Sequence, residues 1–154
     1  LQYGIISTAV KGIRVYGGTN ASGGMTWSYR SDASDNGLRS TLGAYTLTGS
    51  TAETALSATT LDCTGAAPCY GIYANGMVSQ STGTVNLDSN FTGGTVTSTV
   101  GPMTTSIFGN NIATTAGTAS NVQIDFNVNA TASEQASAAS DYTDNLIFTC
   151  KADI

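Results

Sequence analysis

The chain has 154 residues, a formal net charge of −5 and no histidine. Its 5 Lys and Arg residues never cluster, which argues against a nucleic-acid surface and against binding to an anionic membrane. The lack of histidine excludes Ser-His-Asp and Cys-His nucleophiles, and no apolar run approaches the roughly 20 residues that span a bilayer.

The remaining composition is typical of a β-protein. Only 10% of the residues are charged, whereas 17 Ser, 25 Thr and 18 Gly supply most of the polarity. Thr favours strands, and Gly favours turns. Strands and turns alternate with the rhythm of about 8–12 residues that a sandwich has. We therefore expect one all-β domain, an Ig-like antiparallel β-sandwich.

The first segment, Leu1 to Ser7, places Leu1, Tyr3 and Ile5 on one side of a short strand. Thr8 and Ala9 follow as a joint of small residues, so we divide the chain into residues 1–9 and a sandwich domain at 10–154. The segment has no basic start and is too short for a signal-peptide core. We expect a processed, exported chain at the cell surface.

The next elements form a strand, a turn and a strand. Val10 to Tyr16 alternates, with Ile13 and Val15 inward, and the glycines and polar residues of 17–24 predict a turn. Met25 to Arg30 returns as a strand. Trp27 is its expected core anchor, and Tyr29 shares the face of Trp27.

The middle of the chain is less regular. Residues 31–37 predict a polar loop, whose two aspartates do not match a calcium-binding loop, and residues 38–47 predict an irregular edge. Cys63 and Cys69 are close enough for a disulfide, which would stabilise by about 2–2.5 kcal/mol and indicate an oxidising compartment. The alternative is two reduced thiols, and no metal site is expected.

Four strands are expected between this loop and the last third of the chain. They cover 69–77, 84–87, 94–100 and 103–108, and Gly109-Asn110-Asn111 ends the last of them.

The richest apolar alternation lies between Asn121 and Cys150. Its first strand has one inward face, made by Val122, Ile124, Phe126 and Val128. The second strand, Asp141 to Cys150, is expected to pair with it as an antiparallel hairpin, with Leu146 and Phe148 inward. Cys150 shares that phase, which favours a buried thiol over an intermolecular bridge.

No catalytic constellation stands out, so we expect no enzyme and no cofactor. The acids are more typical of turn caps and solvated faces than of a glycosidase pair, which leaves a small secreted hydrolase as a distant alternative. They are Asp62, Asp88, Asp125, Asp141 and Asp144. Three tripeptides match the N-glycosylation acceptor, at Asn20, Asn90 and Asn129.

The segment from Ala139 to Thr149, with Asp141-Tyr142-Thr143-Asp144 and an apolar ending, resembles the last strand of pilin-like β-sandwich subunits such as spore coat protein U and archaic chaperone–usher pilins. Ser106-Ile107-Phe108-Gly109 is similar to the short strand that precedes that ending. Two residues before the tyrosine, where those pilins usually have a glycine, this chain has Ser140. The early cysteine of those pilins is missing.

This resemblance implies an exported filament subunit whose sheet is completed by a strand from its neighbour. The expected partner is therefore a second copy in a head-to-tail homopolymer, with host or surface ligands as further candidates. The expected interface comprises Leu1, Tyr3, Ile5, Val122, Ile124, Phe126, Val128, Leu146 and Phe148. The alternative is a monomeric adhesin or carbohydrate-binding module that uses Trp27 and the tyrosines. A virion or phage-tail protein would share this composition.

Overall fold

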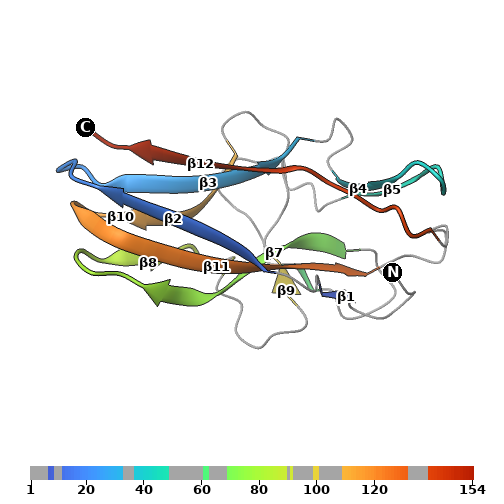
Figure 1. The fold of residues 1–154 in the computed structure, drawn as a ribbon, viewed down its shortest axis with the longest axis horizontal. Helices are drawn as coiled ribbons and strands as arrows, with labels where there is room; N and C mark the ends of the chain where they lie inside the picture. Colours follow the sequence, from blue (N-terminus) through green and yellow to red (C-terminus); the bar gives the residue numbers. More distant parts are fainter. Residues whose placement is uncertain are drawn as a thin grey trace.

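The computed structural model describes residues 7–8, 12–32, 37–48, 61–62, 69–89, 91, 99–100, 109–131 and 139–154 (Figure 1). The strands are β1 Ser7–Thr8, β2 Ile13–Thr19, β3 Met25–Ser31, β4 Gly37–Ser40, β5 Tyr45–Thr48, β6 Leu61–Asp62, β7 Cys69–Ser79, β8 Val85–Leu87, β9 Thr99–Val100, β10 Asn110–Thr115, β11 Ala119–Thr131 and β12 Leu146–Ala152. This described part contains no helix that could cross a membrane.

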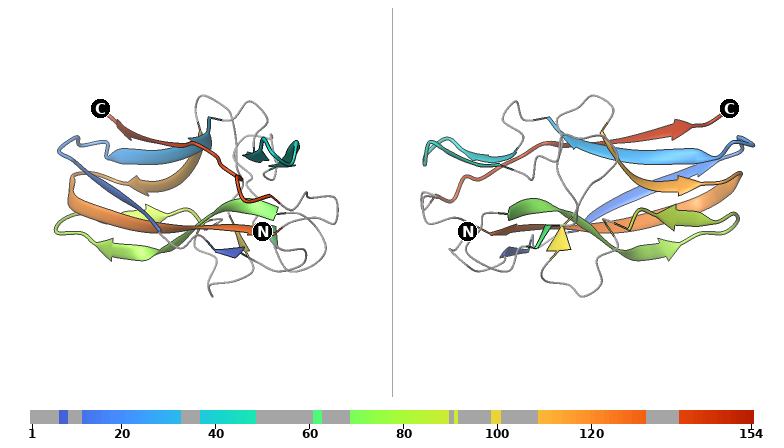
Figure 2. Two further views of the ribbon diagram at one scale, coloured as in Figure 1. Left: turned by 45° about the vertical axis from the view of Figure 1, so that its right-hand side comes forward. Right: turned by 180° about the vertical axis from the view of Figure 1, so that it is seen from behind.

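Two antiparallel sheets pack face to face, which confirms the predicted all-β sandwich (Figure 2). The first sheet is built on β11. Because β7 takes one edge of β11 over Gln123–Thr131, β1 and β2 must share the other edge. The second sheet has the order β12-β3-β10-β8, and two small pairs, β4-β5 and β6-β9, lie outside the two sheets.

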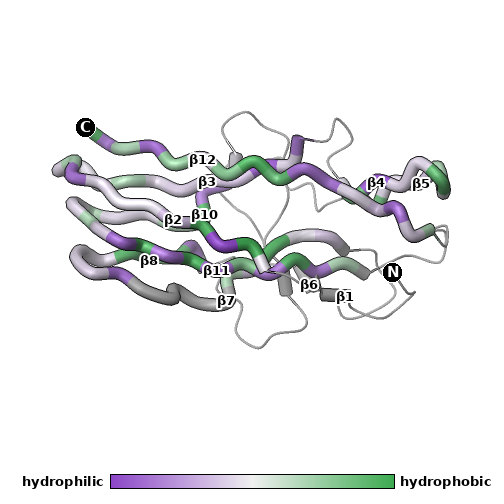
Figure 3. The backbone as a smooth tube through the Cα atoms, viewed as in Figure 1, coloured by the Kyte–Doolittle hydropathy of each residue, from purple (hydrophilic) through white to green (hydrophobic). Residues whose placement is uncertain are grey.

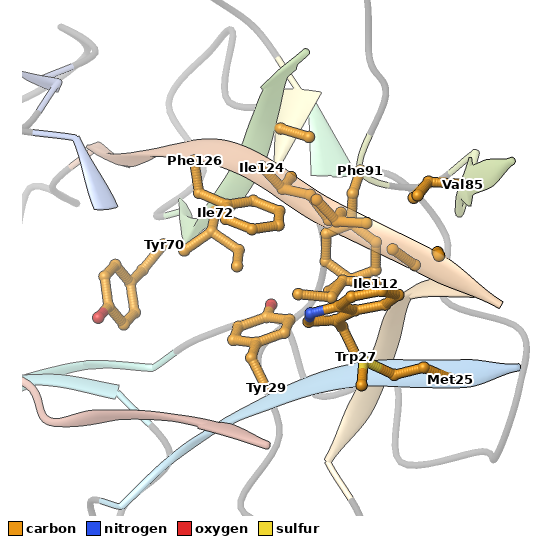
Figure 4. Close-up of a cluster of buried hydrophobic side chains, with 14 of the residues drawn as sticks. Met25, Trp27, Tyr29, Tyr70, Ile72, Val85, Phe91, Ile112, Ile124 and Phe126 are labelled. Carbon is orange, nitrogen blue, oxygen red and sulfur yellow. The ribbon is translucent and has the colours of Figure 1, made fainter. Parts of the chain in front are cut away.

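The core forms where the inner faces of the two sheets meet (Figure 4). Trp27 and Tyr29 of β3 point toward Ile124 and Phe126 of β11, as their strand alternation predicts. The Tyr29 ring meets Phe91 edge-on, with ring centroids 5.5 Å apart. These aromatic contacts add to the free energy gained from burial alone.

Gly17 lies under the Trp27 ring and belongs to β2, not to a turn. A β-carbon at Gly17 would lie 2.8 Å from Trp27 Cζ2 and Nε1, so only glycine fits this close approach. The turn begins after Thr19 and closes where the Gly24 N–H donates to the Ala21 carbonyl at 3.2 Å. The predicted turn over 17–24 therefore started too early in the chain, because Gly17 and Gly18 were assigned to the turn and belong to the strand.

The predicted hairpin of Asn121 to Cys150 is wrong. The alternation along β11 is present (Figure 3), but β11 pairs with β1, β2 and β7, whereas β12 pairs with β3 in the other sheet. The two strands meet across the core, where the Phe126 and Phe148 ring centroids are 5.8 Å apart. Apolar alternation shows which face of a strand is buried, but it does not show which strand pairs with it. Two strands with buried faces can therefore pack across the core from opposite sheets.

Three further predictions need correction. Asn110 and Asn111 begin β10 and do not end a strand, since β10 pairs with both β3 and β8. The irregular edge at 38–47 is the β4-β5 hairpin. Residues 141–145 precede the last strand, which begins at Leu146. The strands predicted at 25–30, 69–77, 84–87 and 122–128 are confirmed, and residues 103–108 lie outside the described residues.

Cys150 is exposed, which corrects its predicted burial. Its register partner is Trp27, so its phase is the inward one that the sequence indicated. However, β12 is an edge strand, and among the described strands it pairs only with β3. An inward phase at the end of an edge strand does not guarantee a covering layer.

Candidate functional site

A groove of about 540 Å³ opens between the two sheets, and we call it the intersheet groove. Both sheets, β4 and the residues before β12 contribute to it. The lining residues are Ile13, Leu38, Tyr70, Val128, Tyr142, Thr143, Asp144, Leu146 and Phe148. A groove of this size with a mostly apolar lining is suited to a few bulky side chains or one small ligand.

The strand register explains why these side chains gather here. Ile13 is the partner of Phe126, and Val128 lies two residues farther along β11 on the same inner face. Leu146 and Phe148 face them from β12, opposite Ser31 and Tyr29. Ile13, Val128, Leu146 and Phe148 remain only half-buried, because β2 and β12 are both edge strands and leave this side of the sandwich uncovered.

One carboxylate interrupts the apolar lining. Asp144 accepts hydrogen bonds from the Ser31 hydroxyl and from the Tyr70 hydroxyl, each at 2.8 Å. Desolvation by burial raises the pKa of Asp144, and the two hydroxyl donors oppose that shift. Because Ser31 is in β3 and Tyr70 is in β7, Asp144 links the two sheets at the base of the groove.

The groove wall formed by 141–144 is tied to the β4-β5 hairpin. Asp141 accepts hydrogen bonds from Ser40 Oγ at 2.5 Å and from the backbone N–H groups of Thr41 and Leu42 at 2.9 Å. These donors hold the pKa of Asp141 well below its usual range. Arg39 and Thr143 exchange two backbone hydrogen bonds of 2.9 Å, so the wall and the hairpin form one unit.

The short strand β1 lies next to the groove on β11. Ser7 is the register partner of Ala130, and Thr8 is the partner of Asn129, directly after Val128 of the groove lining. The predicted joint, Thr8 and Ala9, falls at the end of this strand. Four residues, 9–12, separate the β1 and β2 ladders along the chain, whereas only 127 and 128 separate the same two points on β11.

The predicted interface residues separate into three groups. Val128, Leu146 and Phe148 line the groove, whereas Val122, Ile124 and Phe126 are fully buried in the core. Leu1, Tyr3 and Ile5 lie outside the described residues. Sequence reasoning missed Ile13, Leu38, Tyr70, Tyr142 and Asp144 as lining residues, because only the packing of the two sheets brings them together.

The other predicted sites differ in outcome. Cys63 lies outside the described residues, which contain no disulfide, so the Cys63–Cys69 bridge stays a prediction. Asn20 is exposed between β2 and β3, and Asn90 is not among the described residues. Asn129 is 0% exposed within β11, which leaves no room for a sugar there in the folded chain. An acceptor tripeptide does not report the burial of its Asn.

In the described part of the chain, no three acids or cysteines gather as a metal site would require. Asp125 pairs with Arg14 through two hydrogen bonds of 2.7 Å on the outer face of the first sheet. Trp27 is only 1% exposed, which confirms it as the predicted core anchor and removes it from the surface that the alternative binding module would use. What the described residues offer is an apolar groove with one carboxylate beside an edge of β11.

Comparisons with known proteins add no relative: no family model, no curated protein and no solved structure matches this chain.

Proposed function

We propose that this chain is a structural subunit of an extracellular filament, with an Ig-like sandwich that residues 1–8 of a neighbouring copy complete. The observation that carries the proposal is the register of β1 on β11, Ser7 opposite Ala130. Ala130 belongs to the core-facing side of β11, together with Phe126 and Val128. A strand that continues in this register gives every odd-numbered residue the same phase as Ser7, which lies opposite the core-facing Ala130.

The sequence before β1 suits that phase. Its odd-numbered residues are Leu1, Tyr3 and Ile5, and its even-numbered residues include Gln2 and Gly4. The intersheet groove beside β1 has exposed apolar surface that such side chains would cover. Full burial of each large side chain contributes roughly 1.5–3 kcal/mol before entropy costs. A strand with apolar side chains at alternate positions therefore suits the groove.

The same pairing can be made within one chain or between two. In the single chain, Ser7 and Thr8 pair with their own β11. Exchange of this strand between copies would use the same contacts between two chains. Figure 1 shows β1 and the end of β12 in opposite halves of the long axis. Because such a contact joins two different surfaces, it propagates into a fibre.

Charge substitutions in the two phases of the segment test the proposal. We expect Tyr3→Asp to abolish filaments in electron micrographs, because it places a charge among core-facing apolar residues. Gln2→Asp is the matched control, adds the same charge in the other phase and leaves filaments intact. Deletion of residues 1–8 abolishes assembly as well. Normal filaments from the deletion variant would refute the proposal.

A cysteine pair distinguishes exchange between chains from pairing within one chain. Register partners lie close enough for a disulfide, so we choose Ser7→Cys with Ala130→Cys, with Cys150→Ser to remove the exposed thiol. Oxidised filaments should give a ladder of covalent multimers on non-reducing gels, with the peptide that joins the two introduced cysteines identified by mass spectrometry. A monomer band that carries the same cross-linked peptide would place the strand in its own sheet.

One observation favours a second candidate, the monomeric carbohydrate-binding module. Tyr142 and Phe148 line the groove together with the Asp144 carboxylate, and aromatic rings beside a carboxylate are suited to sugar rings and hydroxyls. This alternative predicts a monomer near 15.6 kDa at high concentration, with glycan binding that Tyr142→Ala removes.

A further inference from the structure

The intersheet groove holds a carboxylate that no cation of the described residues neutralises. Asp144 is part of its lining, and none of the described lining residues is Lys or Arg. Among the described residues, the charged group that shifts the pKa of Asp144 is Asp32, which is also an acid. Taking a carboxylate partly out of water is costly unless a positive charge joins it. The groove is therefore suited to a ligand that brings a positive charge.

The hydrogen bonds of Asp144 narrow the choice of cation. Its Oδ1 accepts from the Ser31 hydroxyl and its Oδ2 from the Tyr70 hydroxyl, each at 2.8 Å, and the Asn145 backbone N–H also donates to this carboxylate. These neutral donors orient the carboxylate and leave its charge in place. A carboxylate has about four lone-pair sites, so three donors leave little room for the N–H groups of a primary ammonium. A quaternary ammonium has no N–H to satisfy.

Three aromatic rings from separate segments line the same groove. Tyr70 comes from β7 and is 1% exposed, whereas the half-buried rings of Tyr142 and Phe148 come from the wall at 141–144 and from β12. The Phe148 ring stacks on Tyr29 with centroids 6.0 Å apart, which fixes it from the core side. Aromatic faces carry a negative potential and attract quaternary ammonium groups that lie within about 6 Å of the ring centroid.

We propose that the intersheet groove binds a quaternary ammonium group, of the size of the trimethylammonium head of choline, between the Asp144 carboxylate and the rings of Tyr142 and Phe148. The aliphatic lining residues would pack against its methyl groups. A groove of about 540 Å³ has space for this head and for a short chain attached to it. The inference does not rest on the proposed function, because every side chain that it uses belongs to one described chain.

Calorimetric titration of the soluble full chain with matched ligands tests the charge. The probes are choline and 3,3-dimethyl-1-butanol, in which a carbon atom replaces the nitrogen at nearly the same shape. We expect choline to bind at least tenfold more tightly than this neutral analogue. Ethanolamine, which has the primary ammonium, should bind at least threefold more weakly than choline. Methyl glucoside should not bind.

Three variants assign the binding to named side chains. Asp144→Asn should weaken choline about tenfold and leave the neutral analogue unchanged, because it removes only the charge. Tyr142→Leu keeps apolar surface without a ring, and should weaken choline about threefold. Asp153→Asn is the matched control, since it removes the same charge from a 41% exposed carboxylate that is not among the lining residues. If Asp144→Asn does not fold, the two ligands and Tyr142→Leu decide together.

Equal affinity for choline and its neutral analogue would overturn the inference, as would the lack of choline binding at millimolar concentration. An equal loss in Asp144→Asn and Asp153→Asn would also overturn it. Binding of methyl glucoside in place of choline would assign the groove to the sugar ligand of the second candidate function.

Vesicles of phosphatidylcholine distinguish the two sources of such a group. Co-sedimentation of the full chain with these vesicles, lost in Asp144→Asn, would identify a lipid head group as the ligand. Choline binding without co-sedimentation would identify a free solute.

Discussion

The same strands build two ends of the sandwich that differ in completeness. At the packed end, Val122 and Ile124 of β11 are fully buried, and Trp27 fills the space above Gly17. At the groove end, Val128 of the same strand and Phe148 of β12 are only half-buried. Both ends have the alternation of a core strand, so the pattern alone does not distinguish a filled core from a partly open one.

The difference follows from what lies along the strand edges. Toward the packed end, β2 pairs with β11 over six register positions that end at Phe126. Beyond that point the edge of β11 is taken up, among the described strands, only by the two residues of β1. On the opposite sheet, β12 is an edge strand. An apolar side chain beside an incomplete edge keeps part of its surface in water, and such edges invite association.

The largest expected contrast between the two ends comes from truncation along β11. Phe126→Ala should lower the free energy of unfolding by about 3–5 kcal/mol, because it leaves a cavity beside Phe148. Val128→Ala should cost less, about 1 kcal/mol, because this smaller side chain is only partly buried. Urea unfolding monitored by tryptophan fluorescence measures both. Equal losses would contradict a groove end that is incomplete in the monomer.

A smaller effect is expected where glycine makes the packed end fit. Gly17→Ala should cost about 1–3 kcal/mol, because the new methyl group would overlap the Trp27 ring. Gly117→Ala is the matched control, since its nearest neighbour would be the Ser22 carbonyl oxygen at an ordinary 3.8 Å. Thermal unfolding of the two variants checks this. A neutral Gly17→Ala would show that Trp27 can shift, and that this end is looser than its burial indicates.

The stability of the groove wall at 141–144 should depend on pH, because Asp141 ties this wall to the β4-β5 hairpin. The pKa of this carboxyl is lowered by hydrogen bonds from Ser40, Thr41 and Leu42, so its stabilising effect is present above the usual Asp value of about 3.9. That effect is lost as the pH falls through the lowered pKa. Asp141→Asn should therefore speed proteolysis in the turn at 41–44 at pH 7, and the difference from the wild type should shrink near pH 2.5. A pH-independent difference would contradict this.

The smallest expected effect has the opposite sign and concerns Asp144. Burial raises its pKa, so the folded chain holds this proton more tightly than the unfolded chain does. Its contribution to stability therefore falls as the pH rises from about 4 through the raised pKa. Asp144→Asn should flatten the stability curve between about pH 4 and 7. Asp153→Asn is the control, because this carboxylate is 41% exposed and is not among the groups that shift the pKa of Asp144. A steeper curve for Asp144→Asn would show that the two hydroxyl donors outweigh burial.

Particular residues show how far sequence reasoning reached. The inward phases of Trp27, Phe126 and Leu146 are correct, because side chains alternate along a strand in any partner arrangement. The pairing of β11 with β12 was wrong, because two strands close in sequence can belong to opposite sheets. The strand β10 was missed, since an Asn-Asn pair indicates a turn unless neighbouring strands supply its hydrogen bonds.

The candidate site divides in the same way. Val128, Leu146 and Phe148 were predicted as interface residues from alternation, and they line the groove. Asp144 and Tyr70 are far apart in sequence and meet only because β7 and the residues before β12 come together. The burial of Asn129 likewise depends on neighbours in the sheet and not on its own tripeptide.

By itself, the sequence determined the all-β class, the face of each main strand and the lack of histidine chemistry, because composition and period-two alternation are local properties. The tertiary structure decided which strands share a sheet, that Gly17 admits the Trp27 ring, and that one end of the sandwich holds a half-open groove. Those features depend on which surfaces meet in space, and the alternation that marks the buried face of a strand does not tell which strand lies along its edge.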